Sequence, residues 1–213
     1  MEAWAAFPGL ERLDPATAGE RRVALTFDDG PDTDSTPAVL DALDAIGVRA
    51  TFFVVGEQLE RNWRIARDAA ERGHELALHG YTHPRHDRLA PAAARDEVAR
   101  GVGAFEAALG RRPALMRPPY GFFSEHSYAA CRKLELEPIY WSAWGLDWEA
   151  ITPDRIADLA CRDLVPGMIV LLHDSPRYAE RRSALATAEA LPEIAERAAD
   201  LGLELGPLGL SGP

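Results

Sequence analysis

The sequence predicts an α/β protein of a single domain, with about seven parallel strands that alternate with helices. Two observations predict this fold class. Short apolar runs rich in Val, Ile and Phe alternate along the chain with segments whose apolar residues recur at helical spacing. Polar or charged residues follow several of these runs directly. The first observation allows an open doubly wound sheet or a barrel. The second favours the barrel, because barrel enzymes carry their chemistry at the carboxyl ends of the strands.

In the first half of the chain, strand and helix signals alternate clearly. Residues 23–27 form a mostly apolar run that ends in two adjacent carboxylates and the turn signal Gly30-Pro31, and we expect a buried strand there. Apolar residues at helical spacing from 39 to 46 predict a helix that ends at Gly47. The run 50–55 is β-branched and aromatic, which predicts the next strand.

The second half repeats the pattern. A helix over 91–109 ends at Gly110. Thr152-Pro153 begins a helix that runs to 163, because a capping residue is followed by Pro at the first helical position. Residues 168–172 have the strongest strand signal. The remaining elements are helices over 61–72, 124–134 and 182–201, and strands over 75–78, 114–116, 138–141 and 203–205.

The chain divides into three segments. Residues 1–20 are a lead-in in which Trp4 and Phe7 are available to pack on the domain. Residues 21–205 carry the alternating elements and form the folded domain. Residues 206–213 are rich in Gly and Pro, and we expect a loose tail.

Length, composition and charge limit the classes of function. A chain of 213 residues, 47% hydrophobic and 27% charged, suits one domain with a large core. The net charge of -11, without a Lys/Arg cluster, argues against nucleic acid and anionic membrane partners. Cys131 and Cys161 lack metal-ligand spacing and are interpreted as buried thiols in helices. The oligomeric state stays open.

The location of the protein in the cell is a default expectation. No apolar run reaches the ~18 residues of a spanning helix, and residues 1–6 lack the pattern of a secretory signal. We therefore expect a cytoplasmic protein, or an exported or cell-wall protein if a leader was removed.

Asp28 and Asp29 are adjacent carboxylates at the end of the first strand. Successive side chains of a strand point to opposite faces, so the two share a site only if the chain turns there. Gly30-Pro31 supplies such a turn. A solvated acidic turn is the alternative, since Asp is common before Gly-Pro.

His79 and His83 are four residues apart and follow the predicted strand over 75–78. With one carboxylate such as Asp29 they form a two-His-one-carboxylate set, which leaves positions open on a metal and is typical of catalytic sites. The alternative is a pair of surface histidines in a loop. His74 and His86 are interpreted in that second way.

Two further strand ends carry candidate groups. Arg117 precedes two prolines, so its guanidinium would be held in place and could orient a carboxylate. His173 ends an apolar strand, where a buried core histidine is the alternative. Paired with a carboxylate such as Asp147, it would be a proton donor near neutral pH.

Together these motifs resemble those of the polysaccharide deacetylases of carbohydrate esterase family 4, the NodB-homology domain. The resemblance spans the chain from Thr26 to Asp174. The matching segments are Thr26-Phe27-Asp28-Asp29-Gly30-Pro31, His79 to His83, Arg117 to Tyr120, Asp147-Trp148 and Leu171-Leu172-His173. The resemblance implies a distorted barrel with residues 21–205 as the catalytic domain. It also implies one divalent metal, with zinc expected and cobalt, nickel or manganese as alternatives.

Carried over residue by residue, the resemblance implies a role for each candidate. Asp29, His79 and His83 would hold the metal. Asp28 would be the general base, held by Arg117. A metal-activated water would then attack the acetyl group of an acetylated saccharide, with N-acetyl expected and O-acetyl as the alternative, to give acetate.

The resemblance also implies the general acid, the oxyanion donor and the residues around the acetyl group. His173 would be the general acid, oriented by Asp147. The backbone N–H of Tyr120 would stabilise the oxyanion. Trp148 and Leu171 would line the pocket for the acetyl group.

The chain departs from the family pattern at two positions. Gly80 stands where the family usually has Ser or Thr, which removes a loop-stabilising hydroxyl and affects metal affinity. Trp144 replaces the earlier of two acids in the fourth motif, so we expect a different substrate preference. Aromatic residues in the loops of this face could stack on sugars or pack the loops themselves. They are Tyr81, Phe122, Phe123, Trp141, Trp144 and Tyr178.

Two other functions stay open. One is a metal-dependent hydrolase of small non-sugar amides on the same barrel. The other is an inactive saccharide-binding protein, which would need no pair of base and acid. The presence of both candidate groups argues against it.

Overall fold

The computed structural model describes residues 6–14, 16 and 19–210, and its centre is a sheet of eight strands. Seven of them lie in the order β5-β4-β3-β2-β1-β7-β6, and β8 pairs with β1 on the side. All the strand pairs are parallel. The strands are β1 Arg22–Asp28, β2 Thr51–Val54, β3 Glu75–Leu78, β4 Leu115–Met116, β5 Glu137–Pro138, β6 Ala143–Trp144, β7 Ile169–His173 and β8 Glu204–Gly206.

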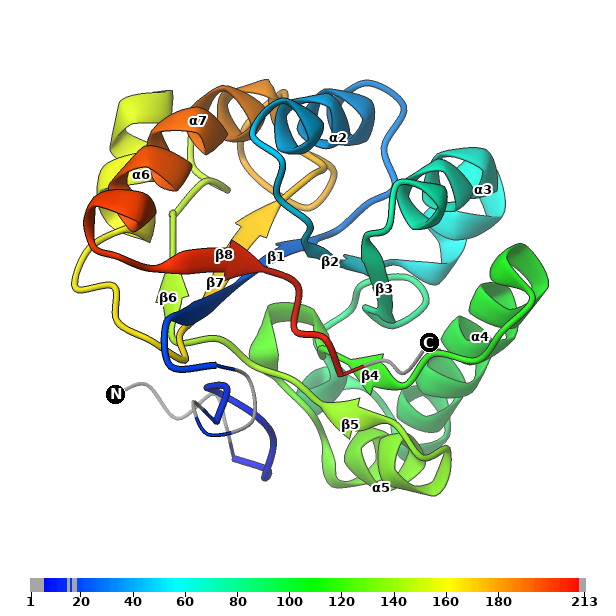
Figure 1. Cartoon of the computed structure of the whole chain (residues 1–213). Coiled ribbons are helices and arrows are strands. Elements are labelled where there is room, and N and C mark those ends of the chain that lie inside the picture. The colour runs from blue at the N-terminus through cyan, green and yellow to red at the C-terminus, as the bar shows by residue number, and fades with distance from the viewer. Residues whose placement is uncertain (1–5, 15, 17–18, 211–213) are drawn as a thin grey trace.

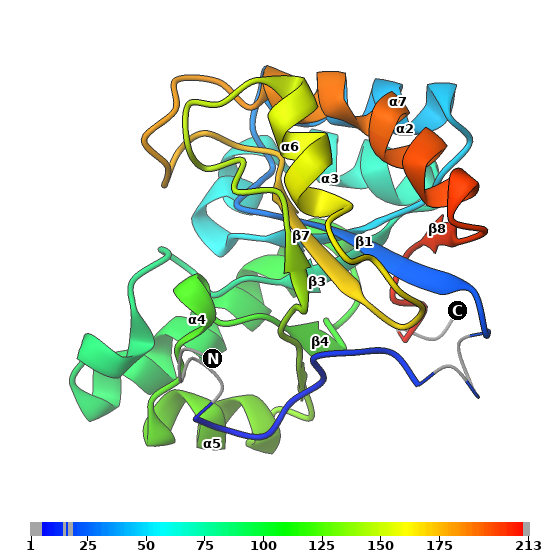
Figure 2. The same cartoon turned by 90° about the vertical axis from the view of Figure 1, so that its left-hand side faces the viewer.

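The helices surround the strands (Figure 1). They are α2 Ser35–Ala45, α3 Gly56–Glu71, α4 Pro91–Leu109, α5 Glu125–Lys133, α6 Pro153–Ala160 and α7 Leu185–Asp200. Two 3-10 turns, η1 His86–Arg88 and η2 Pro119–Gly121, follow strand ends. Figure 2 shows the sheet between α2, α6 and α7 on one side and α4 and α5 on the other. The expected fold class, an α/β protein with a distorted barrel of parallel strands, is confirmed.

Helix boundaries follow local chemistry. Thr152 caps α6 by accepting a hydrogen bond from the Arg155 N–H, and Pro153 is at the first helical position, as expected. Ser124 and Ser127 form a reciprocal capping box at the start of α5. The helix expected from residue 61 begins earlier, at Gly56, because the strand before it stops at Val54.

Side chains of β1 alternate between two apolar layers. Val23, Leu25 and Phe27 belong to the layer beneath the helices. Ala24 belongs to a second cluster, inside the curved sheet, with residues such as Leu171. The alternation of strand side chains therefore directs Thr26 and Asp28 to the inside of the curved sheet. In the register of β1 and β7, Asp28 lies beside His173 and Thr26 beside Leu171.

The strands form a half-barrel with β5 and β6 at its two edges. The expected strand over 138–141 is instead two short strands, because the chain leaves one edge after Pro138 and reaches the other at Ala143. The lead-in bridges this gap, since Leu10 pairs with Ile139 and Arg12 pairs with Met168. Irregular segments of the chain thus span the gap between the two edges of the half-barrel.

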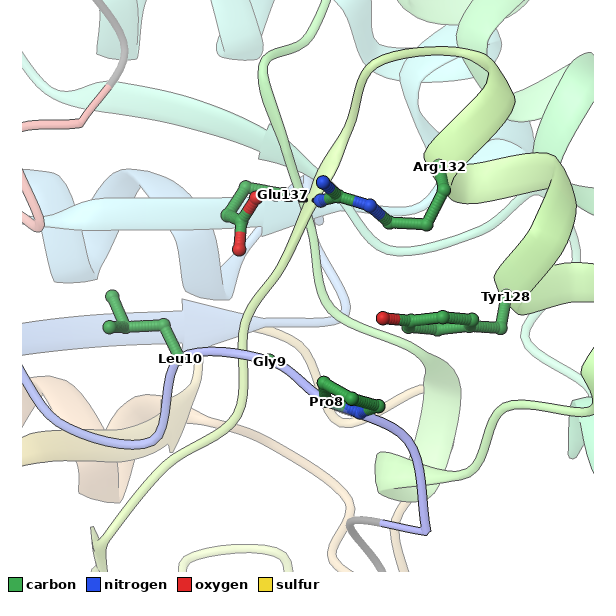
Figure 3. Close-up of a pocket in the computed structure, with 6 residues that line it drawn as sticks. All are labelled: Pro8, Gly9, Leu10, Tyr128, Arg132 and Glu137. Carbon is green, nitrogen blue, oxygen red and sulfur yellow. Dashed lines mark hydrogen bonds and ion pairs between the residues drawn. The ribbon is translucent and has the colours of Figure 1, made fainter.

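The lead-in also packs on α5. The Phe7 ring stacks on Tyr128 at a centroid distance of 4.9 Å, whereas Trp4 lies outside the described residues. A shallow hollow of about 290 Å³ lies where Pro8–Leu10 passes Tyr128, Arg132 and Glu137 (Figure 3). None of its lining residues is a candidate site residue.

The described part of the tail differs from the expected loose segment. The Leu208 N–H donates to Thr51 Oγ1, and the Gly209 and Leu210 N–H groups donate to the carboxylate of Glu75. The Leu208 side chain is buried in the inner apolar cluster. The Gly and Pro residues of the tail therefore do not prevent residues 208–210 from packing on the domain.

The two thiols also have different surroundings. Cys131 is buried within α5, as expected. Cys161 is only half-buried and follows the end of α6. Among the described residues, no helix has the length and apolar character needed to cross a membrane.

Candidate active site

Strand ends bring the candidate groups together at one edge of the sheet. Asp28 is the last residue of β1, and His173 is the last residue of β7. His79 follows β3, Arg117 follows β4, and Asp147 follows β6. Because the strands are parallel, these positions share one end of the half-barrel. All five of these residues were predicted from the sequence.

Asp28 is held by a buried arginine. The Arg117 guanidinium donates from Nη1 to Asp28 Oδ1 at 2.7 Å and to Thr26 Oγ1 at 2.9 Å. Its Nη2 donates to the Tyr140 carbonyl at 3.0 Å. The side chain of Arg117 is 0% exposed and lies 4.0 Å over the Phe53 ring. Burial lowers the Arg117 pKa, and the charge of Asp28 opposes that change.

Asp29 has different partners from its neighbour. It has a φ of 84°, in the left-handed region, so the backbone turns directly after β1. Its Oδ1 lies 3.0 Å from His83 Nε2 and 3.6 Å from His79 Nε2. One ligand atom from each of the three residues lies within 4.8 Å of the others, and all three residues are buried. The turn after β1 thus separates the two adjacent carboxylates.

The three residues fit a divalent metal. Nδ1 of His79 lies 2.8 Å from the Arg117 carbonyl, so it donates there as N–H and leaves Nε2 as a lone-pair ligand. Burial lowers the His79 pKa to about 4, which keeps the ring neutral. Oδ1 of Asp29 is buried and accepts no hydrogen bond from the described residues. Two imidazoles and one carboxylate are a donor set that suits zinc.

Charge and aromatic contacts fix the cluster further. Burial alone would raise the pKa of Asp29, but its interactions with His83 and His173 hold that pKa well below its usual range. The His83 ring is covered by Tyr178, stacked at 4.0 Å, and by Tyr120, edge-on at 4.6 Å. The imidazole of His83 therefore has little freedom to rotate away.

His173 and Asp147 form a second buried pair, with His173 beside Asp28 in the β1–β7 register. His173 Nδ1 donates to Asp147 Oδ1 at 2.8 Å, and the His173 backbone N–H donates to Asp147 Oδ2 at 2.8 Å. Burial lowers the His173 pKa, but the charge and hydrogen bond of Asp147 outweigh it and raise the pKa to about 9. The imidazole is thus a protonated group near neutral pH.

Residues expected around an acetyl group lie near this pair. The Trp148 ring meets the His173 ring edge-on at 5.5 Å. Leu171 is buried in the inner apolar cluster, against which Trp148 packs. Tyr120 has a φ of 57°, within η2, and its side chain is 48% exposed. The apolar wall and the turn at Tyr120 border the two sides of the site.

Four residues around the site were not predicted from the sequence. The Asp174 carboxylate accepts from the Gly30 N–H at 3.1 Å and from Thr36 Oγ1 at 2.5 Å, which fixes the turn after Asp29. Its position directly after His173 was the only signal. The others reach the site from distant segments, without a local motif. They are Glu97 on α4, and Arg181 and Thr187, which contact Asp147.

His74 and His86 correct the expectation of surface histidines. His74 is buried, accepts from the Ala50 N–H at Nδ1 and meets the Phe52 ring edge-on at 5.3 Å. His86 is fully buried in η1, and burial lowers its pKa to about 4. Both therefore belong to the core, because loops between helix and sheet cross apolar layers here.

Most of the loop aromatics contact the protein itself. Tyr81 lies under the Arg100 guanidinium at 3.8 Å, and Phe122 lies under that of Arg85 at 3.8 Å. Phe123 and Trp141 are buried, and Tyr178 stacks on His83. Trp144, 37% exposed, is the aromatic of the expected set that offers the most surface to a ligand.

Comparison with known proteins identifies the family. The family model for polysaccharide deacetylase matches residues 16–139. A chitooligosaccharide deacetylase from Bradyrhizobium sp. is 37% identical over 198 residues, which cover 90% of each chain. A peptidoglycan-N-acetylglucosamine deacetylase from Bacillus cereus is 30% identical over 200 residues, covering 92% of this chain and 73% of its own.

Solved structures agree with this result. A crystal structure of a peptidoglycan N-acetylglucosamine deacetylase has a TM-score of 0.82 and 29% identity, and covers 90% of this chain and 87% of its own. A family 4 pseudoenzyme from Bacillus anthracis has a TM-score of 0.80 and 27% identity, over 92% of this chain and 66% of its own. The shared motifs, the shared fold and the matched family model together place this chain in the polysaccharide deacetylase family of hydrolases.

Proposed function

We propose that the protein hydrolyses the N-acetyl group of an acetylated saccharide and releases acetate and a free amine. One observation carries the proposal. Asp28, held by Arg117, and His173, held by Asp147, lie at neighbouring strand ends beside the cluster of Asp29, His79 and His83. A base and an acid around a two-His-one-carboxylate cluster are what amide hydrolysis requires.

Asp28 and His173 divide the proton transfers. Asp28 Oδ2 faces the cluster, 3.6 Å from His79 Nε2, while its Oδ1 is occupied by Arg117. In the proposal Oδ2 takes the proton of the attacking water. The protonated Nε2 of His173 then gives a proton to the amine nitrogen as the C–N bond breaks. Asp147 holds His173 in the tautomer and orientation that this transfer needs.

Asp29, His79 and His83 would hold the metal, with zinc as the proposed ion. When bound, it would polarise the acetyl carbonyl and lower the pKa of water. The backbone N–H of Tyr120 is proposed as the second group that stabilises the oxyanion. Leu171 and Trp148 are proposed to hold the methyl group.

The substrate class follows from the family and from Trp144. Relatives of this chain are named for chitooligosaccharide and peptidoglycan substrates, which share N-acetylglucosamine units. Trp144 pairs with Leu171 in the β6–β7 register, so it lies on the wall beside the proposed acetyl pocket. This position favours a saccharide with a further ring to stack on the indole. A small non-sugar amide is the second candidate, because the exposed Trp144 indole could also block a long substrate from the site.

The test is acetate release with added zinc or cobalt. The substrates are chitooligosaccharides of increasing length, with small N-acetyl amides lacking a sugar in parallel. Acetate release that rises with oligosaccharide length supports the saccharide function. Release from small amides alone supports the second candidate. Saccharide binding without any release, with zinc bound, would make the chain an inactive binding protein.

A further inference from the structure

The loop between the two histidine ligands is attached to the protein by one buried carboxylate. Glu97 of α4 is 8% exposed. Its Oε2 accepts from the Tyr81 N–H at 3.1 Å and from the Thr82 N–H at 2.9 Å, and its Oε1 accepts from Thr82 Oγ1 at 2.6 Å. Both residues lie between His79 and His83. Three donors in the loop thus meet one anion.

A second support comes from the start of α3. The Gly56 N–H donates to the Gly80 carbonyl at 3.0 Å, and the Glu57 N–H donates to the Tyr81 carbonyl at 2.9 Å. The N–H groups at a helix start have no partners within the helix, so they suit this role. The loop is therefore fixed through its carbonyl groups by α3 and through its N–H groups by Glu97.

The loop also packs closely on α4. A Cβ at Gly101 would lie 2.9 Å from the Gly80 carbonyl oxygen, closer than real side chains come. Two residues along the same helix, a Cβ at Gly103 would meet no atom within 4 Å. Gly80 itself has a φ of +76° and carries no side chain, so it contributes no polar anchor to the loop. The anchoring of this segment depends on its neighbours.

We propose that Glu97 is a positioning residue for the metal site, which holds the 79–83 loop so that His79 and His83 converge on Asp29. The inference rests on the proposed function in one respect, namely that these three residues bind a metal. A carboxylate that accepts three hydrogen bonds fixes the backbone more strongly than a neutral group, because bonds to a charged acceptor are stronger. Its negative charge also favours a cation in the nearby site.

The test measures zinc affinity rather than turnover. The dissociation constant for zinc is determined by competition with a chromophoric chelator, and the absorption spectrum of the cobalt form reports the geometry at the metal. We expect Glu97→Ala to bind zinc about 10- to 100-fold more weakly, the usual effect of losing such a supporting group. Glu97→Gln and Thr82→Val should show smaller losses, since each retains part of the hydrogen-bond set.

Two matched controls distinguish a specific effect on the 79–83 loop from a general loss of stability in α4. Glu106→Gln removes a carboxylate from the exposed face of the same helix, where it pairs with Arg112, and should keep zinc affinity within about twofold. Gly101→Ala and Gly103→Ala make the same change to α4, but only the first inserts a methyl group against Gly80. We expect only Gly101→Ala to weaken zinc binding and alter the cobalt spectrum.

Each outcome bears on the inference. A folded Glu97→Ala protein with wild-type zinc affinity would overturn it. If that variant does not fold, wild-type affinity in both Glu97→Gln and Thr82→Val would overturn it instead. A wild-type protein that binds no zinc would refute both this inference and the proposed metal site. Zinc binding that weakens as expected, in a protein that releases no acetate, would refute the proposed function alone.

Discussion

Two buried ion pairs border the site, with Asp28 and His173 side by side at the ends of β1 and β7, and the pairs differ in which member can exchange a proton. In the pair of Arg117 and Asp28 the cation is a guanidinium, which stays charged, and the carboxylate faces the cluster of Asp29, His79 and His83. In the pair of Asp147 and His173 the anion is fully buried, and the imidazole faces the site. The same kind of contact therefore prepares a proton acceptor in one pair and a proton donor in the other.

Each of the two ion pairs is fixed by further contacts of one partner. Arg117 is held by Thr26, by the Tyr140 carbonyl and by the rings of Phe53 and Trp141. Asp147 is held by the His173 N–H, by Thr187 and by Arg181 at 3.5 Å. In each pair the partner that does not face the site has several further contacts. That partner provides the rigidity, and the group facing the site keeps one free atom.

Removing the proposed base is expected to have the largest effect. Asp28→Asn keeps the shape and a hydrogen-bond acceptor for Arg117, but it cannot take a proton from water. We expect acetate release to fall by about 10²- to 10⁴-fold, the usual contribution of a positioned base. Zinc affinity should change little, because Asp29 and not Asp28 belongs to the ligand cluster.

The control is Asp34→Asn, which removes an exposed carboxylate in the segment after β1. Its rate should equal that of the wild type. An unchanged rate in Asp28→Asn would show that the base is another group and that the two pairs do not divide the proton transfers.

Substitution of Asp147 in the pair of Asp147 and His173 should shift the pH profile of kcat/KM. The general acid must be protonated, and Asp147 raises the His173 pKa from 6.5 to about 9. In Asp147→Asn this attraction is lost, so the alkaline limb of kcat/KM should move down by about two pH units. At pH 8 the rate should fall by about 10-fold, with a smaller loss at pH 6. A loss that is equal at all pH values would contradict the role of Asp147 in the pKa of His173.

The sequence predicts both pairs because each member ends or follows a strand within a recognisable motif. It predicts a distorted barrel of parallel strands for the same reason, since β1 and β7 are nearly continuous apolar runs. It does not predict β6, which is only two residues long and pairs at the far edge. Nor does it predict Glu97 or Arg181, whose role depends on tertiary contacts between segments that lack a local pattern.

The folding stability of the metal-free protein should also report the coupling between Asp147 and His173. The folded-state pKa of His173 is raised, so its stabilising contribution is fully present below pH 6.5 and is lost as the pH rises through about 9. Between these values the free energy of unfolding should fall by about 3 kcal/mol more in the wild type than in Asp147→Asn. Urea unfolding at several pH values, with a chelator present, measures this difference. Equal slopes in the two proteins would mean that His173 is not coupled to Asp147.

The smallest expected effect concerns the sugar rather than the proton transfers. Trp144 is beside Leu171 in the β6–β7 register, and Tyr120 is beside His83. If the indole stacks on a sugar ring, Trp144→Ala should raise KM for a long chitooligosaccharide by about 2- to 10-fold, with kcat nearly unchanged. KM for a small N-acetyl amide should stay the same, because such a substrate does not reach the indole.

Trp63→Ala is the control, since this tryptophan lies on α3 between two arginines and carries no proposed role. A lower KM for small amides in Trp144→Ala would have the opposite meaning. The indole would then restrict access to the site and select against large substrates instead of binding them.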